Sequence, residues 1–334
     1  MRGARSVAHW REGGHIDLSY EQLLHEGLQS YARSIGIIDT DQVRWQIGRS
    51  LERPYSSVYH VNAALGAGSS VVCYLKTFRV PPDRPDMERR LRDRVLRSRW
   101  LAEHVGKPSV VAVPPILASD PDQLAIVFLA VEGEPLGKAW NYLVRGRIRS
   151  AREQFLRVGR AIREIESLSL QEAEPSSYLD RPNVREAIMD ALPYLEDGDA
   201  HRMLERVDEL YHLFARKESQ SYFSHGDVNH SNVLLDRDHV YLIDFDLSSR
   251  PVTFDLSLFL LRLELERPAF RPWSDAIATW TAEGYGAPDI RSDPAFALVR
   301  LIKLSDSIMA AASREDQRRL GRYVSILEKS LLGS

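Results

Sequence analysis

The stretch HGDVNHSNVLLDRDHVYLIDFD, residues 225–246, decides how the fold of this chain is interpreted. Asp227 stands five residues before Asn232, and the apolar run VYLI then leads to Asp244 and Asp246. The runs VLL and VYLI are typical of two short strands joined by a turn. A hairpin of these strands would bring Asn232 and Asp244 together, with Asp227 close to both.

These residue types suit one kind of chemistry. Phosphoryl transfer depends on a carboxylate that orients the attacking hydroxyl and on amide and carboxylate oxygens that hold Mg²⁺. Asp227 fits the first role, whereas Asn232 and Asp244 fit the second. Each piece alone is weak, because an Asp-x-Asp near a strand end is more often a solvated turn. The joint pattern is more specific and predicts a phosphoryl-transfer site.

The rest of the chain predicts an α+β fold of two lobes. We expect residues 1–132 to form an N-terminal lobe with a helical leader and a five-stranded antiparallel sheet, and residues 133–334 to form a mostly helical C-terminal lobe. The periodicity predicts strands at 43–51, 57–65, 71–80, 110–117 and 123–131, and helices at 20–37, 87–104 (capped by Asp86), 143–168, 184–217, 254–266, 273–283 and 295–332.

Composition excludes several classes of protein. The chain has 334 residues, a formal net charge of −3 and a single cysteine, Cys73. The charge gives no general attraction to nucleic acid, and one cysteine permits no internal disulfide. No apolar run approaches the length of about 18 residues needed to span a bilayer, and the N-terminus lacks the apolar segment of a secretory signal. We therefore expect a cytoplasmic protein; its oligomeric state is left open.

The stretch HGDVNHSNVLL, followed by YLIDFD, resembles the aminoglycoside phosphotransferase and choline kinase-like family, which has the protein-kinase-like fold. RPVTFDLSLFL (residues 250–261) is similar to the family's next segment, whose aspartate, here Asp255, supports the catalytic loop. VGRAIREIESL (residues 158–168) is similar to the helix before that loop, although the family's leucine–histidine pair is Ile165–Glu166 here.

The resemblance implies a role for each residue of the catalytic stretch. Asp227 would be the catalytic base or orienting carboxylate, and Asn232 and Asp244 would bind Mg²⁺. Asp246 would either help to hold a second metal ion or be a salt-bridged loop acid. His225 would be a buried hydrogen-bonding anchor rather than a proton carrier.

The resemblance also implies nucleotide contacts. Lys76 lies on the third expected strand, where kinase-like proteins carry the lysine that contacts the α- and β-phosphates; the alternative is an edge-strand lysine in solvent. Glu88 is the first candidate for its carboxylate partner and Asp93 the second. The backbone at Leu129 and Val131 resembles the hinge that bonds adenine. No glycine-rich loop is visible in the expected first turn, ERPYSS.

Together these features predict a small-molecule kinase. It would transfer the γ-phosphoryl of ATP or GTP to a hydroxyl of a sugar-like, aminoglycoside or amino-alcohol acceptor. Asp180, Glu264 and Glu266 would suit a cationic acceptor, although ordinary surface charge explains these acids equally well. One alternative is an inactive nucleotide-binding pseudokinase that acts as a scaffold or regulator. A protein kinase is a third interpretation, but IDFD stands where aspartate-phenylalanine-glycine is expected.

Overall fold

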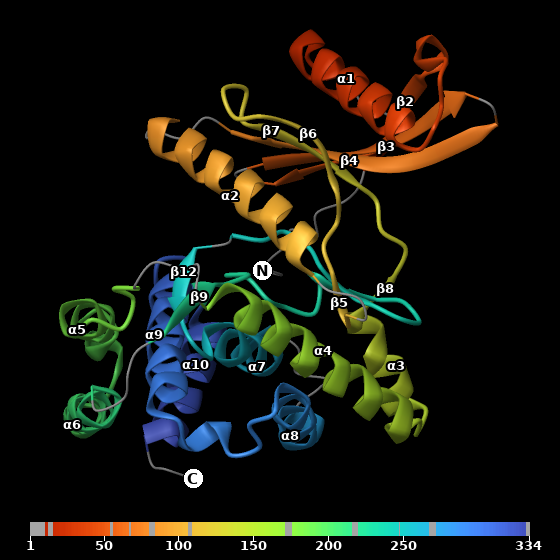
Figure 1. The fold of residues 1–334 in the computed structure, drawn as a ribbon. Helices are drawn as coiled ribbons and strands as arrows, with labels where there is room; N and C mark the ends of the chain where they lie inside the picture. Colours follow the sequence, from red (N-terminus) through yellow and green to blue (C-terminus); the bar gives the residue numbers. More distant parts are fainter. Residues whose placement is uncertain are drawn as a thin grey trace. The chain divides into compact units, whose positions relative to one another are not determined.

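The computed structural model describes residues 11–12, 16–53, 56–66, 68–79, 84–105, 109–170, 176–215, 220–246, 248–266 and 272–331. The fold is α+β, as the sequence predicts, with strands concentrated in the N-terminal part and helices in the C-terminal part (Figure 1). The described residues cluster into two compact units. Unit 1 comprises Met1–His104 and Val113–Glu132, and unit 2 comprises Val105–Ala112 and Gly133–Ser334.

Unit 1 is built on an antiparallel sheet with the strand order β1-β2-β3-β4-β7-β6 among the described residues. Its strands are β1 (Arg11–Glu12), β2 (Arg44–Arg53), β3 (Ser56–Gly66), β4 (Ser69–Phe78), β6 (Ile116–Asp120) and β7 (Ala125–Leu129). The sheet has one strand more than the five expected, because the two residues of β1 pair with the edge of β2.

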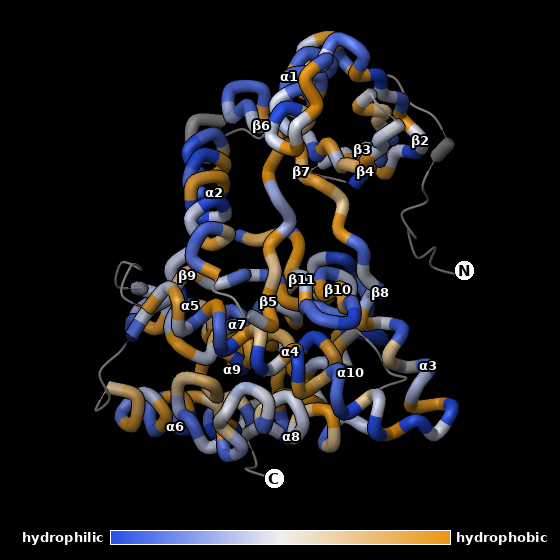
Figure 2. Tube along the Cα trace, turned by 45° about the vertical axis from the view of Figure 1, so that its right-hand side comes forward, coloured by the Kyte–Doolittle hydropathy of each residue, from blue (hydrophilic) through white to orange (hydrophobic). Residues whose placement is uncertain are grey.

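The two faces of this sheet carry different helices. Along β4, alternation sends Cys73 and Leu75 into a core with Leu24 and Leu28 of α1 (Leu18–Ser34). Phe78 points to the opposite face, where its ring lies 5.7 Å from the guanidinium carbon of Arg94 on α2 (Arg84–His104). Figure 2 shows α2 as mostly hydrophilic with a few hydrophobic positions, as expected for a helix with one buried stripe.

Helix α2 begins earlier than the sequence predicts. The expected start is Met87 with Asp86 as its cap, but the helix starts at Arg84, so Asp86 lies inside the first turn. Proline at position 85 favours this start, because its missing N–H is not needed in the first helical turn.

Unit 2 contains α3 (Ala139–Val144), α4 (Ile148–Ser169), α5 (Arg181–Met189), α6 (Asp197–Phe214), α7 (Phe254–Glu266), α8 (Ser274–Tyr285), α9 (Pro294–Ala312) and α10 (Gln317–Leu331). The helices expected at 184–217 and 295–332 are wrong, since each is two shorter helices, and the helix expected at 143–168 begins only at Ile148. Gly146 (φ +69°) separates α3 from α4, and Glu315 (φ +55°) separates α9 from α10. Between α5 and α6 the chain forms a short 3-10 turn at Leu192–Tyr194. Two of the breaks are polar in sequence, RGR at 145–147 and SRED at 313–316, whereas the break between α5 and α6 keeps the apolar residues Leu192, Tyr194 and Leu195.

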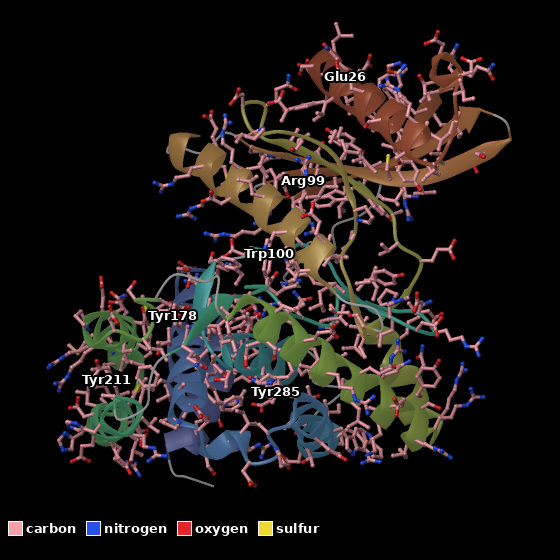
Figure 3. All side chains as sticks on the ribbon, in the orientation of Figure 1. Glu26, Arg99, Trp100, Tyr178, Tyr211 and Tyr285 are labelled. Atoms are coloured by element: carbon pink, nitrogen blue, oxygen red, sulfur yellow. The ribbon has the colours of Figure 1, made fainter. Side chains whose placement is uncertain are left out.

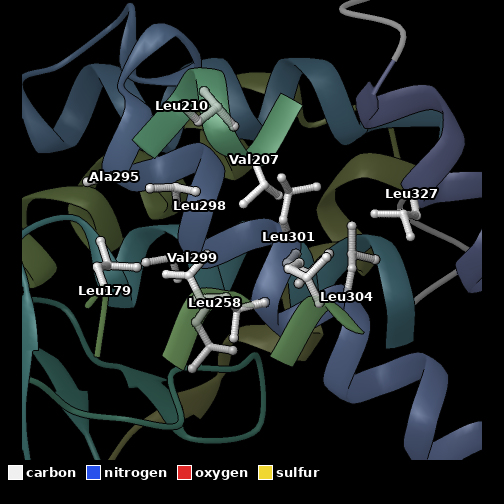
Figure 4. Packing of buried hydrophobic residues seen from close by; sticks show 14 of the residues in the cluster. Leu179, Val207, Leu210, Leu258, Ala295, Leu298, Val299, Leu301, Leu304 and Leu327 are labelled. Atoms are coloured by element: carbon white, nitrogen blue, oxygen red, sulfur yellow. The ribbon is translucent and has the colours of Figure 1, made fainter. Parts of the chain in front are cut away.

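The core of unit 2 surrounds α9. Its Leu298, Val299 and Leu304 are buried against Val207 of α6 and Leu258 of α7 (Figure 4). Burial of each such side chain stabilises the fold by about 1.5–3 kcal/mol. None of the described helices is both long and apolar enough to cross a membrane.

Short strands carry the remaining chain of unit 2. One sheet consists of β5 (Val111–Ala112), β8 (Glu134–Pro135), β10 (Val233–Leu235) and β11 (Val240–Leu242), in the order β5-β11-β10-β8. In a second, two-stranded sheet, β9 (Ser221–Phe223) pairs with β12 (Ser249–Pro251). The single strand expected at 110–117 is wrong, because β5 pairs in parallel with β11 and β6 of unit 1 starts only at Ile116. Two prolines, at 114 and 115, interrupt the run, and proline cannot donate to a ladder.

Candidate active site

The expected hairpin forms from β10 and β11. Val233 faces Leu242 and Leu235 faces Val240 in the antiparallel register. The ladder extends by one bond, from the amide of Ile243 to the carbonyl oxygen of Asn232 (2.9 Å). Asn232 and the residue after Ile243, Asp244, therefore leave the same end of the hairpin.

Asp227 lies beside this hairpin end. Asn232 Nδ2 donates to the backbone oxygen of Asp227 (3.0 Å) and to its Oδ2 (3.1 Å). Asn229 Nδ2 donates to the same backbone oxygen (3.1 Å). Because the amide nitrogen of Asn232 is engaged with Asp227, its Oδ1 is the atom left to accept a ligand contact.

Asp244 lies close enough to Asp227 for its charge to act on that carboxyl group. Burial raises the pKa of Asp227, and the charge of Asp244 adds to this rise. Arg262 and hydrogen bonds from Asn229 and Asn232 lower the same pKa. Asp244 has φ +66°, a left-handed conformation that non-glycine residues rarely adopt and that clusters at functional sites. The structure therefore brings Asp227, Asn232 and Asp244 together.

His225 anchors the loop to the hairpin. It is fully buried, and its Nε2 lies 2.8 Å from the carbonyl oxygen of Ile243. Its Nδ1 accepts from the amide of Asp227 (3.3 Å). Because a carbonyl only accepts and an amide N–H only donates, we assign the neutral ring with its proton on Nε2. The ring therefore serves as a structural support.

Asp255, in the first turn of α7, holds the loop in place. Its Oδ2 accepts from the amide of His225 (2.7 Å) and its Oδ1 from that of Gly226 (3.0 Å). Its own amide donates to the hydroxyl of Tyr222 (2.9 Å). The carboxyl group is almost completely buried, so these bonds fix the backbone just before Asp227.

The buried Asp255 should make stability depend on pH. Burial raises its pKa to about 6, against the lowering effect of the Gly226, His225 and Tyr222 hydrogen bonds. Between the unfolded value of about 3.9 and this value, the native state binds more protons, so the free energy of unfolding falls as pH rises. The fall should total about 3 kcal/mol.

Urea unfolding at about pH 4.5 and about pH 7.5 measures this effect when Asp255→Asn serves as the reference, since it lacks the titrating group. The stability of the natural chain minus that of the variant is expected to be smaller at the higher pH. An unchanged difference would contradict the assignment.

Gly226 and Asp246 pack tightly together. Gly226 has φ +80°, and a Cβ at this position would lie 2.6 Å from Cβ of Asp246. The amide of Asp246 donates to the carbonyl oxygen of His225 (2.8 Å), and its Oδ2 accepts from the Ser248 hydroxyl. Through these contacts Asp246 holds the loop at Gly226.

Gly226→Ala is therefore expected to destabilise the chain by about 2–3 kcal/mol, through strained φ and through the clash with Asp246. Gly68→Ala is the matched control. Gly68 has φ +77°, but a Cβ added there would meet no atom within 4 Å, so the variant should lose only about 1 kcal/mol. Thermal unfolding compares the two variants, and equal losses would show that the contact with Asp246 contributes nothing.

Glu166 helps to hold the start of α7 in place, a role that the sequence did not predict. It is fully buried on α4, where the resemblance leads one to expect histidine. Its Oε2 accepts from the amide of Thr253 (3.0 Å), and its Oε1 accepts from the Tyr285 hydroxyl (2.6 Å). Figure 3 labels Tyr285 among the side chains of unit 2. Arg163 completes the set with an ion pair at 2.6 Å. Thr253 has φ +75° and directly precedes α7, so Glu166 fixes the strained turn that positions Asp255.

The residues expected to contact the nucleotide lie in unit 1. Lys76, opposite Val58 and Ile126, lies on the central part of the sheet, not at its edge. Its Nζ is 5.1 Å from the ring centroid of Phe78, so it shares the face on which α2 packs. This placement removes the interpretation of Lys76 as an edge-strand residue.

Helical spacing separates the two candidate partners of Lys76. Glu88 stands two turns before Val95 and one turn before Leu91, and both of these are buried. Asp93 falls on the other side of α2. The position of Glu88 therefore favours it over Asp93.

The hinge residues differ in what they can offer. Leu129 ends β7, and its amide donates to the carbonyl oxygen of Pro115 (2.8 Å). That amide is already engaged, so a nucleotide contact at Leu129 would use its carbonyl or its side chain. Val131 follows the strand and is half-buried.

Similar solved structures share this fold. The GDP and kanamycin complex of APH(2")-IIia matches with a TM-score of 0.57 and 13% identity, over 95% of this chain and 100% of that one. A thermostable mutant of aminoglycoside phosphotransferase APH(4)-Ia with AMP-PNP and hygromycin B matches with a TM-score of 0.53 and 12% identity, over 90% and 97%. Glucosamine kinase with glucosamine, ADP and inorganic phosphate matches with a TM-score of 0.53 and 16% identity, over 87% and 79%.

A search of curated protein sequences gives no match. The profile of the phosphotransferase enzyme family (APH), in contrast, matches residues 58–292. The matched region contains the whole stretch from His225 to Asp246, together with Lys76, Glu88 and Asp255. The chain belongs to the phosphotransferase enzyme family.

Proposed function

We propose that this phosphotransferase transfers the γ-phosphoryl of ATP or GTP to a hydroxyl of a small acceptor. The observation that carries the proposal is the meeting of Asp227, Asn232 and Asp244 at one end of the β10–β11 hairpin. The structural neighbours support it, since they were solved with GDP, AMP-PNP or ADP and with a small hydroxyl-bearing compound.

Asp227 is the residue that acts on the acceptor. Its Oδ2 is engaged by Asn232, and the half-exposed carboxylate retains lone pairs for an incoming hydroxyl. It orients the hydroxyl oxygen toward the γ-phosphorus and takes the proton as the new O–P bond forms. The bond from the γ-phosphorus to the bridging oxygen breaks, and the nucleoside diphosphate leaves.

The metal ligands are Asn232, through Oδ1, and Asp244. Among the described residues, no cluster of three or more His, Cys, Asp or Glu side chains suits a metal. Mg²⁺ does not require one, because it takes one or two protein oxygens together with phosphates and waters. When bound, it neutralises charge on the phosphates. Asp246 remains a candidate for a second ion, although its hydrogen bond with Ser248 favours a supporting role.

We assign the nucleotide contacts to residues 1–132 and catalysis and acceptor binding to residues 133–334. Lys76 contacts the α- and β-phosphates and Glu88 holds Lys76 in place. The backbone around Leu129 and Val131 bonds the base. The position of Lys76 on the central part of the sheet and the position of Glu88 on the buried stripe of α2 support these roles.

Coupled release of ADP or GDP across a panel of acceptors tests the proposal. The panel should include neutral sugars, amino sugars, aminoglycosides and choline-like alcohols, with and without Mg²⁺. Metal-dependent release with at least one acceptor is expected. Nucleotide binding without release, for every acceptor, would instead favour a non-catalytic nucleotide-binding protein.

A further inference from the structure

We propose that Arg262 selects the acceptor by charge. It would disfavour a compound that carries an ammonium group beside its reacting hydroxyl and favour one that is neutral or acidic there. This inference rests on the proposed function, because it concerns the acceptor side of Asp227. It narrows the acceptor to the sugar-like class and away from aminoglycosides and amino alcohols.

Helix α7 places Arg262 at the catalytic carboxylate. Arg262 stands seven residues after Asp255, which is two helical turns, so both side chains leave the same face of the helix. Asp255 holds the backbone at His225 and Gly226, and Arg262 reaches one residue further. Its guanidinium lies 3.8 Å from Oδ1 of Asp227.

Both partners remain reachable. The Arg262 side chain is 39% exposed and that of Asp227 is 49% exposed. An acceptor hydroxyl that reaches Asp227 therefore comes within a few ångströms of a permanent positive charge, since arginine does not lose its proton in proteins. An ammonium group beside that hydroxyl would be repelled, whereas a carboxylate could accept hydrogen bonds from the guanidinium.

Two of the three acids that would suit a cationic acceptor, Glu264 and Asp180, are described. Glu264 forms an ion pair with Arg300 at 2.6 Å, and its carbonyl oxygen accepts a hydrogen bond from Arg322. Asp180 is exposed at the start of α5. The side chain of Glu266 lies outside the described residues. The charge of Arg262 lowers the pKa of Asp227, and the charge of Asp244, a proposed metal ligand, raises it.

The test uses the full chain with three ring compounds of similar shape: glucuronate, glucose and glucosamine. Binding is measured by calorimetry in the presence of Mg²⁺ and ADP, and phosphorylation is measured separately by nucleotide turnover. The natural chain is expected to bind glucuronate about tenfold more tightly than glucosamine, with glucose between them. Arg262→Gln should level the order, and Arg262→Glu should reverse it.

Arg152→Glu is the matched control. Arg152 is 47% exposed and pairs with Glu283 at 2.8 Å, so the variant makes the same change in net charge elsewhere in unit 2. It should preserve the order of affinities. If Arg262→Glu does not alter the order, or if the natural chain binds the three probes equally or not at all, the role of Arg262 is wrong. Charge-dependent binding without phosphorylation would support the role of Arg262 but contradict the proposed function. Phosphorylation without a charge preference would support the proposed function but contradict the role of Arg262.

Discussion

Asp227→Asn is expected to lower phosphoryl transfer about 10³-fold while nucleotide still binds. A positioned general base typically accelerates a reaction by about 10²–10⁴-fold. The asparagine amide keeps the size of the side chain and can still accept from Asn232 through its oxygen. It cannot take a proton from the acceptor, and it loses the charge that pairs with Arg262. Nucleotide affinity should change little, because Asp227 is not among the proposed metal ligands.

The measurement compares turnover by nucleoside diphosphate release with direct nucleotide binding in the same preparation. Asp238→Asn is the control, since Asp238 is an exposed acid in the turn at the opposite end of the same hairpin. It receives the identical chemical change and should retain normal turnover. Turnover in Asp227→Asn that matches this control would refute the role proposed for Asp227.

The sequence predicts one part of the site from a local pattern and another part from the family resemblance. The hairpin that joins Asn232 to Asp244 needs only a few residues between two apolar runs, and the structure contains it. The support by Asp255 also follows the resemblance, and its two bonds to the loop are present. A short-range pattern defines the hairpin, whereas the bonds of Asp255 join residues 30 and 29 positions apart and were expected only from the resemblance.

The features that the sequence missed depend on distant partners. Glu166 carries a charge that usually indicates an exposed position. Its burial is possible because Thr253 and Tyr285, 87 and 119 residues away, satisfy the carboxylate. Arg262 is one of four charged residues in the mostly apolar helix α7, and its spacing from Asp255 is informative only once Asp255 is known to face the loop. The strand expected at 110–117 failed in part for the same reason, since β5 finds its partner in β11, far along the chain.

Gly159→Ala and Gly284→Ala are each expected to destabilise the chain by more than about 3 kcal/mol. Helices α4 and α8 approach each other at these two glycines. A Cβ on Gly159 would lie 2.1 Å from the carbonyl oxygen of Thr281, and a Cβ on Gly284 would lie 2.1 Å from that of Leu156. Both obstacles are backbone atoms, which cannot move aside as a flexible side chain can. The helices must separate, and overpacking of this kind commonly costs about 1–3 kcal/mol even when side chains can yield.

Separation of α4 from α8 should also reach the active site. Tyr285 ends α8 and bonds Glu166 on α4, and Glu166 in turn holds the turn before Asp255. Turnover at a temperature where the variants remain folded should therefore fall as well. Because one separation relieves both clashes, the double variant should lose clearly less stability than the sum of the two single losses.

Gly321→Ala supplies the control for the change from glycine to alanine itself. Gly321 lies within α10, and a Cβ added there would meet nothing within 4 Å. Alanine should stabilise this helix by about 0.5–1 kcal/mol, because it restricts the unfolded chain more than glycine does. Urea unfolding of the four variants gives the comparison. Losses below about 1 kcal/mol at Gly159 and Gly284 would mean that the two helices can move apart freely, and additive losses would mean that the two contacts are independent.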